Sequence, residues 1–265
     1  MKNFAKILLF VLLTSLLACG GNPSKQEQKS SDSTRTIEAV STESASIGLT
    51  DQEKQEGWQL LFDGKNMDKW RGAYLDSMPT KGWTIENEEL VVLPSTGAES
   101  NNGGDIITKE QYSDFELVLE AKLTDSANSG IKYFVVERKP RPKGSAIGLE
   151  FQLLDDGKHP DAKMGKNGNR TIASLYDLIT AQGKKANPIG EWNVARIISK
   201  SKHVEHWLNG TKVVEYERGS PEFKKLVAGS KYKTFEGFGE SEKGHILLQD
   251  HGNKVFFKNI KIRNL

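Results

Sequence analysis

A short segment, residues 148–161, combines acid, amide and imidazole side chains at spacings that could serve catalysis. It reads G-L-E-F-Q-L-L-D-D-G-K-H-P-D. Apolar and polar residues alternate in its first half, as in a strand whose side chains have a period of two, so Glu150 and Gln152 share one face. Asp155 and His159 follow on a loop punctuated by Gly and Pro. The pattern predicts a carboxylate, an amide and an imidazole around one small volume, where they could move protons.

The acidic loop after this strand could also bind a hard cation. Asp155, Asp156, His159 and Asp161 offer mostly oxygen ligands, which suit an ion such as calcium. Their spacing matches no calcium-binding loop, so we expect no metal and keep a divalent cation as the alternative. The sequence shows neither a Gly-rich phosphate loop nor a dinucleotide fingerprint. We therefore expect the protein to work without a cofactor.

Residues 1–18 have the features of a bacterial export signal. Lys2 and Lys6 precede a short apolar run, and the run ends in L-L-A-C at residues 16–19. Such a run is too short for a typical spanning helix and suits a signal peptide. The residues before Cys19, the only cysteine of the chain, resemble a lipobox. We expect Cys19 to be lipidated and to anchor the protein to a bacterial membrane, facing the periplasm or the cell exterior; an ordinary signal peptide is the alternative.

Charge and composition divide the rest of the chain into a tether and one domain. The chain carries a net charge of +2, and residues 1–18 hold two lysines and no acid, so the processed chain has 2 − 2 = 0. A neutral chain gives no support for nucleic-acid binding. Residues 19–55 are mostly polar and predict a flexible tether. Residues 56–265 suit a single domain that must fold without a disulfide.

Most of this domain shows strand patterns. In residues 115–123, Phe115, Leu117, Leu119, Ala121 and Leu123 alternate with Glu116, Val118, Glu120 and Lys122. Asn209-Gly210 predicts a tight hairpin turn between two more strands. One segment predicts a short helix, because Ser220 can cap it, Pro221 suits its first position and Gly229 can end it. Further strands are expected at 131–136, 192–199, 203–208, 211–216, 246–249 and 255–262. The pattern predicts an all-β fold of two antiparallel sheets with one short helix.

Several motifs, taken in order, resemble one known family. They are G-W-Q-L-L-F-D-G-K-N (57–66), N-S-G-I-K-Y (128–133), the segment 148–161, S-L-Y-D-L-I (174–179), E-W-N-V-A-R-I (191–197), H-V-E-H-W-L-N-G (203–210) and G-H-I-L-L-Q-D-H-G with V-F-F-K-N-I-K-I (244–262). This set resembles the 3-keto-disaccharide hydrolase domain family. The resemblance implies a concanavalin A-like jelly-roll sandwich with a ligand cleft on its concave face. It also implies a glycoside substrate that a separate oxidoreductase has already oxidised to a ketone at C3.

A ketone at C3 acidifies the hydrogen on C2, so a base could start elimination of the C1 oxygen, and water could then add back. Glu150 is our candidate for the base, His159 for the acid, and Asp155 is the second carboxylate of the catalytic set. Candidate substrate-binding residues are Gln152, Lys132, Gln249, Asp250, His251 and Tyr176.

Two other functions fit the same fold class. A lectin-like, non-catalytic carbohydrate-binding lipoprotein is the main alternative, although it would not need clustered ionisable residues. A laminarinase-type hydrolase is weaker, because those enzymes resemble an E-x-D-x-x-E strand and this strand reads E-F-Q-L-L-D.

Overall fold

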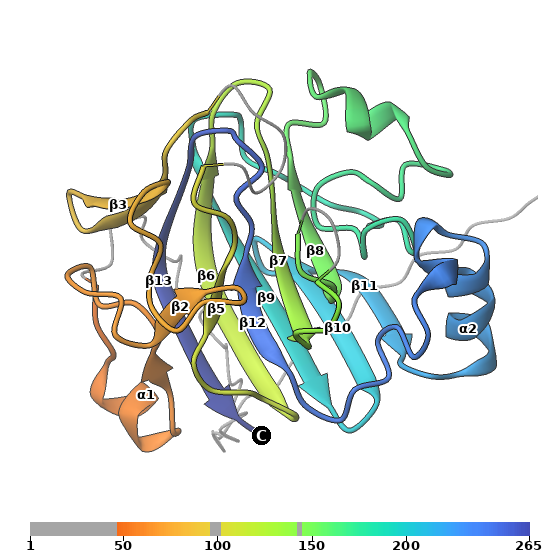
Figure 1. The fold of residues 1–265 in the computed structure, drawn as a ribbon, viewed down its shortest axis with the longest axis horizontal. Helices are drawn as coiled ribbons and strands as arrows, with labels where there is room; N and C mark the ends of the chain where they lie inside the picture. Colours follow the sequence, from red (N-terminus) through yellow and green to blue (C-terminus); the bar gives the residue numbers. More distant parts are fainter. Residues whose placement is uncertain (1–46, 96–101, 142–144) are drawn as a thin grey trace, which may run out of the picture. The chain divides into compact units, whose positions relative to one another are not determined.

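Two antiparallel sheets form the fold (Figure 1). The computed structural model describes residues 47–95, 102–141 and 145–265. The expected signal peptide, Cys19 and most of the expected tether lie outside these residues. The elements are α1 (Asp51–Gln55), β1 (Gln59–Leu60), β2 (Trp70–Gly72), β3 (Trp83–Glu86), β4 (Glu89–Val92), β5 (Ile106–Thr108), β6 (Phe115–Leu123), β7 (Asn128–Val135), β8 (Leu149–Leu154), η1 (Pro160–Lys163), β9 (Trp192–Lys200), β10 (His203–Leu208), β11 (Thr211–Glu217), α2 (Pro221–Ala228), η2 (Lys231–Thr234), β12 (His245–Leu248) and β13 (Val255–Asn264).

Strand order explains how distant segments meet. The eight-stranded sheet has the order β11-β10-β9-β6-β13-β4-β3, with β1 also paired to β13. The five-stranded sheet has the order β2-β5-β12-β7-β8. Strand β12 therefore lies beside β7, although more than a hundred residues separate them in the chain. Figure 1 shows the segment after β8, coloured green, and α2, coloured blue, beyond the β8 side of this sheet.

The core lies between the two sheets and is built from the apolar face of each strand. Phe115 of β6 and Tyr133 of β7 meet edge to face across the layers, with ring centroids 6.2 Å apart. Leu149, Phe151 and Leu153 of β8 are at most 1% exposed and belong to the same core. Burying two apolar sheet faces against each other stabilises a domain that has no cysteine.

The all-β prediction is confirmed, and so are its most specific local features. Asn209 and Gly210 have φ of 48° and 78°, as a two-residue hairpin between β10 and β11 requires. Helix α2 begins after Ser220, whose side chain accepts a hydrogen bond from the Phe223 backbone N–H at 3.1 Å, and it ends at Gly229.

Helix α1 lies inside the segment that the sequence analysis assigned to the tether. Thr50 and Glu53 form a reciprocal capping box, and Glu53 also pairs with Lys261 of β13. A one-turn helix with no buried residue has no apolar periodicity, so the T-x-x-E pattern of its capping box was its sequence signal. Within the described ranges, no helix has the length and apolar character needed to cross a membrane.

Candidate active site

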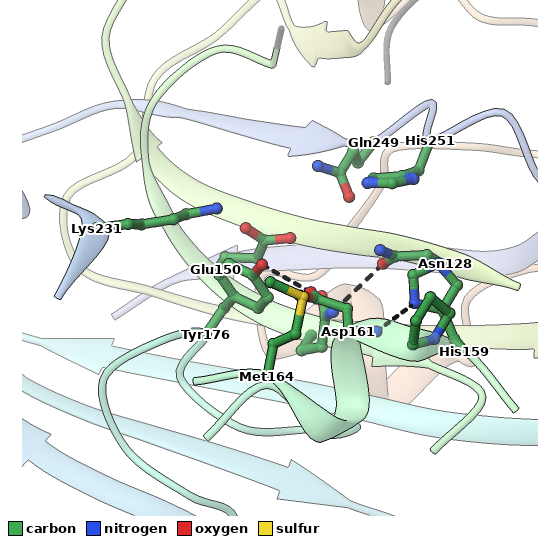
Figure 2. A pocket seen from close by; sticks show the side chains of 11 residues that line it. Asn128, Glu150, His159, Asp161, Met164, Tyr176, Lys231, Gln249 and His251 are labelled. Atoms are coloured by element: carbon green, nitrogen blue, oxygen red, sulfur yellow. Dashed lines mark hydrogen bonds between the residues drawn. The ribbon is translucent and has the colours of Figure 1, made fainter. Parts of the chain in front are cut away.

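A pocket of about 230 Å³ opens on the face of the five-stranded sheet that points away from the core (Figure 2). Its volume lies just below the range of about 300–1,000 Å³ common for small-molecule sites, so it suits one sugar ring better than two. Strands β7 and β8 form its floor, and the segments that follow β8 and α2 form one side. It is lined by Asn128, Glu150, Gln152, His159, Pro160, Asp161, Met164, Tyr176, Lys231, Gln249 and His251.

Glu150 is the carboxylate on the pocket floor. The alternation of β8 turns its side chain away from Leu149 and Phe151, as predicted, yet the residue is only 4% exposed. Its Oε2 lies 3.8 Å from Nζ of Lys132, the residue directly opposite on β7. Figure 2 shows the Lys231 side chain extending toward the Glu150 carboxylate from the rim.

Gly130 provides the space that the Glu150 side chain occupies. It lies opposite Gln152 in the β7–β8 ladder. A Cβ atom on Gly130 would lie 2.9 Å from Cδ of Glu150 and closer still to Oε1. The glycine of the N-S-G motif therefore clears the volume for a carboxylate on the neighbouring strand.

Lys132 was expected to contact substrate, and the structure shows a different position. Its side chain is 6% exposed and does not line the pocket. Its Nζ donates to Ser145 Oγ and, at 3.2 Å, to the Ala146 carbonyl, and Ser145 donates onward to Asp105. Lys132 thus lies behind Glu150 and supplies a buried positive charge, because a lysine directly opposite Glu150 in the ladder packs against it.

Gln152 lines the pocket and has a buried amide. Its Nε2 donates to Asn128 Oδ1 at 3.3 Å, which fixes the orientation of the amide. Its Oε1 is buried and has no hydrogen-bond partner among the described residues. A buried acceptor without a partner is costly, so this oxygen is suited to a hydroxyl group of a ligand.

His159 is a neutral imidazole at the edge of the pocket. Its Nδ1 accepts a hydrogen bond from the Asp161 backbone N–H at 3.2 Å, so in the neutral ring Nε2 carries the proton. Burial lowers the pKa of His159, and His251 lowers it further, because its ring centroid lies 6.0 Å away. Asp161 and Asp155 oppose this shift only in part. At neutral pH the ring is therefore a hydrogen-bond donor.

Tyr176 lines the pocket as expected, and its hydroxyl donates to Asp161 Oδ2 at 2.7 Å. Burial, followed by the bond to Asp161 and the charge of Glu150, raises the pKa of Tyr176 far above its ordinary value. The other oxygen of Asp161 pairs with Arg170 at 2.9 Å. Both oxygens of Asp161 are thus bound to the protein, and Tyr176 stays neutral.

Besides Lys132, two more expected site residues, Asp155 and Asp250, do not line the pocket. The carboxylate of Asp155 accepts backbone N–H groups of Ser126, Gly157 and Lys158 at 2.8–3.2 Å, so it holds the turn that carries His159. Asp250 is fully buried and accepts the N–H groups of Gly104 and Gly252. Gln249 and His251 line the pocket, and Asp250 between them points away, as alternation in an extended segment requires.

Five lining residues, Asn128, Pro160, Asp161, Met164 and Lys231, had no predicted substrate role. Asn128 starts the N-S-G-I-K-Y motif, so the strand alternation that placed Glu150 could have found it. Asp161 was considered only as a metal ligand. Met164 and Lys231 come from irregular segments, and no sequence period connects them to β8.

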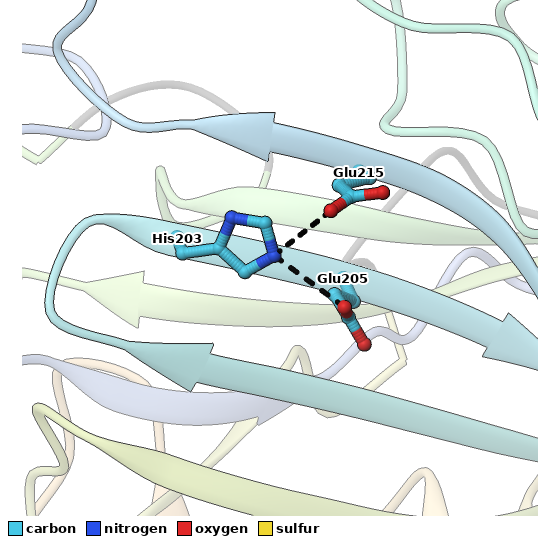
Figure 3. A group of neighbouring side chains, drawn as sticks. All are labelled: His203, Glu205 and Glu215. Atoms are coloured by element: carbon cyan, nitrogen blue, oxygen red, sulfur yellow. Dashed lines mark hydrogen bonds and ion pairs between the residues drawn. The ribbon is translucent and has the colours of Figure 1, made fainter.

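The acidic loop does not gather its side chains around one point. Asp156 pairs with Lys184 at 2.7 Å, Asp161 pairs with Arg170, and Asp155 binds backbone groups. Among the described residues, a metal-compatible group occurs instead on the eight-stranded sheet, where the ligand atoms of His203, Glu205 and Glu215 lie within 4.8 Å of one another (Figure 3). Lys212 pairs with both glutamates, at 3.2 and 2.6 Å, so this group already contains its own cation.

Comparison with known proteins shows the family of this chain. Residues 57–263 match the family described as the 3-keto-alpha-glucoside-1,2-lyase-like domain. A protein of Bacteroides thetaiotaomicron named 3-keto-disaccharide hydrolase is 35% identical over 274 residues, which cover 94% of each chain.

Two crystal structures of predicted glycosyl hydrolases from Parabacteroides distasonis share the fold. The first is 34% identical with a TM-score of 0.71, and the match covers 83% of this chain and 99% of the other. The second is 28% identical with a TM-score of 0.57, and the match covers 78% of this chain and 99% of the other.

The family match spans nearly the whole domain, and the site has the ionisable groups that an enzyme needs. The chain therefore belongs to the 3-keto-disaccharide hydrolase family of glycosidase-like enzymes.

Proposed function

We propose that this protein cleaves glycosides bearing a ketone at C3 by elimination across C1–C2, followed by hydration. Glu150 removes the C2 proton, and the electron pair moves into the C1–C2 bond as the C1–O bond to the aglycone breaks. The leaving oxygen takes up a proton. Water then adds a hydroxyl group to C1 and a proton to C2, which gives a free 3-keto sugar and consumes one water molecule overall.

The observation that carries this proposal is the carboxylate of Glu150 on the pocket floor, with two lysines nearby. Removal of a carbon-bound proton places negative charge on the ketone oxygen, and a preorganised cation or N–H donor stabilises that charge. Lys231 reaches this region from the rim, as Figure 2 shows. Gln152 Oε1 is suited to accept a sugar hydroxyl.

The neutral state of His159 changes the role that the sequence suggested. A ring that is neutral at pH 7 is a weaker proton source than an imidazolium, and its Nε2–H is the available donor. In the proposal, His159 therefore hydrogen-bonds the leaving oxygen or the incoming water. The proton that Glu150 takes from C2 is available to the leaving oxygen on the neighbouring carbon.

A double-displacement mechanism fits the site less well. It needs two carboxyl groups in complementary roles, one acting as the acid. Besides Glu150, the pocket is lined by one carboxylate, Asp161, and both of its oxygens are bound by Tyr176 and Arg170. An elimination that uses one base avoids this requirement.

Isotope incorporation tests the proposal. The protein is incubated in deuterated water with a 3-keto glucoside and with the matched unoxidised glucoside. We expect cleavage of the 3-keto glucoside but not of the unoxidised glucoside, without added cofactor. We also expect deuterium at C2 of the released sugar, after correction for exchange without enzyme. Release of sugar with C2 fully protonated would contradict elimination. Binding without release would favour the lectin-like alternative.

The proposal also extends to the partners and location of the protein. A separate oxidoreductase has to install the ketone, because the elimination consumes no oxidant. Lipidation of Cys19 would keep the domain in the cell envelope, where it could act on glycosides from outside the cell.

A further inference from the structure

One arginine outside the pocket connects the two segments that form one side of it. The loop after β8 carries Tyr176 and the segment after α2 carries Lys231, and we call these two segments the pocket walls. Arg170 donates from Nε to Asp177 Oδ1 at 2.7 Å and from an Nη atom to Asp161 Oδ1 at 2.9 Å. The Arg170 side chain is 15% exposed, and the two aspartates are 7% and 13% exposed. Neither Arg170 nor Asp177 lines the pocket.

Each aspartate also accepts a hydrogen bond from a different wall. Asp161 accepts the Tyr176 hydroxyl at 2.7 Å, which fixes the aromatic wall. Asp177 Oδ2 accepts the backbone N–H of Lys231 at 2.8 Å, although 54 residues separate them, which fixes the start of η2. The two walls also touch, because Nζ of Lys231 lies 4.2 Å from the centroid of the Tyr176 ring.

We infer that Arg170 is a positioning residue, whose two ion pairs hold Tyr176 and Lys231 over Glu150. The inference rests on the proposed function in that both walls face the proposed base. A guanidinium is needed here because its planar fork can bond two carboxylates in fixed directions at once, whereas an ammonium is a single point charge. The backbone of the loop after β8 is held beside β8, because the Tyr176 N–H donates to the Glu150 carbonyl at 3.0 Å, whereas η2 belongs to neither sheet. The contacts of Arg170 therefore set the direction of the Tyr176 side chain and the distance of η2 from it.

The same loop offers a matched control. Lys184 pairs with Asp156 at 2.7 Å, the side chains are 24% and 31% exposed, and neither residue lines the pocket. Replacing Lys184 by Ala removes an ion pair from the loop without reaching either wall. Any effect seen with Arg170→Ala and absent from Lys184→Ala is therefore specific to the contacts of Arg170.

The first measurement needs no substrate. Full-length protein is labelled with 3-fluorotyrosine, and the Tyr176 signal among the six tyrosines is assigned by its loss in Tyr176→Phe. In Arg170→Ala the fluorine resonance of Tyr176 should move toward that of free fluorotyrosine. Guanidinium at millimolar, non-denaturing concentration should move it back, and Lys184→Ala should leave it in place. An unchanged resonance in Arg170→Ala would overturn the inference.

The second measurement uses a 3-keto glucoside. Turnover by Arg170→Ala should fall on the order of 100-fold, as expected for a small misplacement of groups at the reacting centre. Added guanidinium should restore part of it without raising the melting temperature, and Arg170→Lys should be intermediate. Turnover equal to that of Lys184→Ala would count against the inference.

The two measurements also separate the two proposals. If Arg170→Ala does not fold, Arg170→Lys replaces it in both. If the wild-type protein releases no sugar from 3-keto glucosides, the proposed function fails, and the fluorine spectra still decide whether Arg170 positions Tyr176.

Discussion

Lys132 and Glu150 are directly opposite partners on strands β7 and β8, and their charged groups lie 3.8 Å apart with 6% and 4% of each side chain exposed. A carboxylate that is buried this deeply is costly unless a cation or hydrogen bonds offset its desolvation. The pair therefore explains how β8, the edge strand of its sheet, can keep a charged group at the bottom of a pocket.

The two members of this pair should respond differently to neutralisation. Glu150→Gln should lower turnover of 3-keto glucosides by about 100-fold to 10,000-fold, the usual contribution of a general base. It should cost little stability, because Lys132 keeps its contacts with Ser145 and Ala146. Kinetics and urea denaturation measure the two effects. If Glu150→Gln keeps most of its turnover, the base lies elsewhere.

Lys132→Met should cost much more stability than Glu150→Gln. It leaves the buried carboxylate of Glu150 without its ammonium partner and breaks the link through Ser145 to the buried carboxylate of Asp105. Removing one partner of a buried pair costs about 3–5 kcal/mol. Lys158→Met is the control, since Lys158 and Asp125 form an exposed pair, and exposed pairs contribute little to stability. Equal urea midpoints for the two variants would contradict this prediction.

Gly130→Ala should act on the site rather than on the fold. The new methyl group would meet the end of the Glu150 side chain, which can rotate away, so the sheet should persist while the carboxylate moves. We expect a near-native melting temperature and a loss of turnover of about 100-fold. Gly48→Ala, at a position with nothing within 4 Å, controls for the general effect of a glycine substitution. Unchanged turnover in Gly130→Ala would show that Glu150 tolerates displacement.

Stability should fall in mild acid because of His206. This histidine is completely buried, hydrogen-bonded to the Ala173 carbonyl at 3.0 Å and the Tyr133 hydroxyl at 2.7 Å, and burial lowers its pKa to about 4. The unfolded chain binds this proton with a pKa of about 6.5. Between these two values the unfolded state holds more protons, so the free energy of unfolding should decrease by about 1.4 kcal/mol per pH unit as pH falls.

Urea denaturation at several pH values tests this expectation. His206→Gln cannot titrate, so its free energy of unfolding should depend less steeply on pH across that window than the wild-type value does. The lowered pKa values of His159 and His245 would still contribute to both proteins. If the free energy of unfolding has the same pH dependence in His206→Gln and in the wild-type protein, His206 does not cause the loss of stability.

Cys19→Ala tests the expected anchor, which lies outside the described residues. The L-L-A-C order at residues 16–19 predicts lipidation, and a multiply acylated cysteine binds membranes firmly where a single chain binds marginally. The variant should move from the membrane fraction to the soluble fraction after cell lysis. Retention through salt washes without detergent would contradict lipidation.

Local patterns were sufficient for the sheet and for one side of the pocket. Strict alternation placed Glu150 and Gln152 on the face opposite Phe151, because a strand has a fixed period of two. The same alternation continues past the end of β12 at Leu248, so Asp250 lies on the face opposite to Gln249 and His251. Asn209-Gly210 and the Ser220 cap predicted their turn and helix because each depends on a few adjacent residues.

Tertiary structure alone decided which groups meet around Glu150. Sequence alternation predicts which face a side chain occupies, but not that a loop covers that face and leaves Glu150 only 4% exposed. Tyr176 and Lys231 line the pocket together with Glu150. Both come from irregular segments, where no period relates the position in the sequence to the direction of the side chain. Their places depend on contacts such as those of Arg170 with Asp161 and Asp177, which only folding brings together.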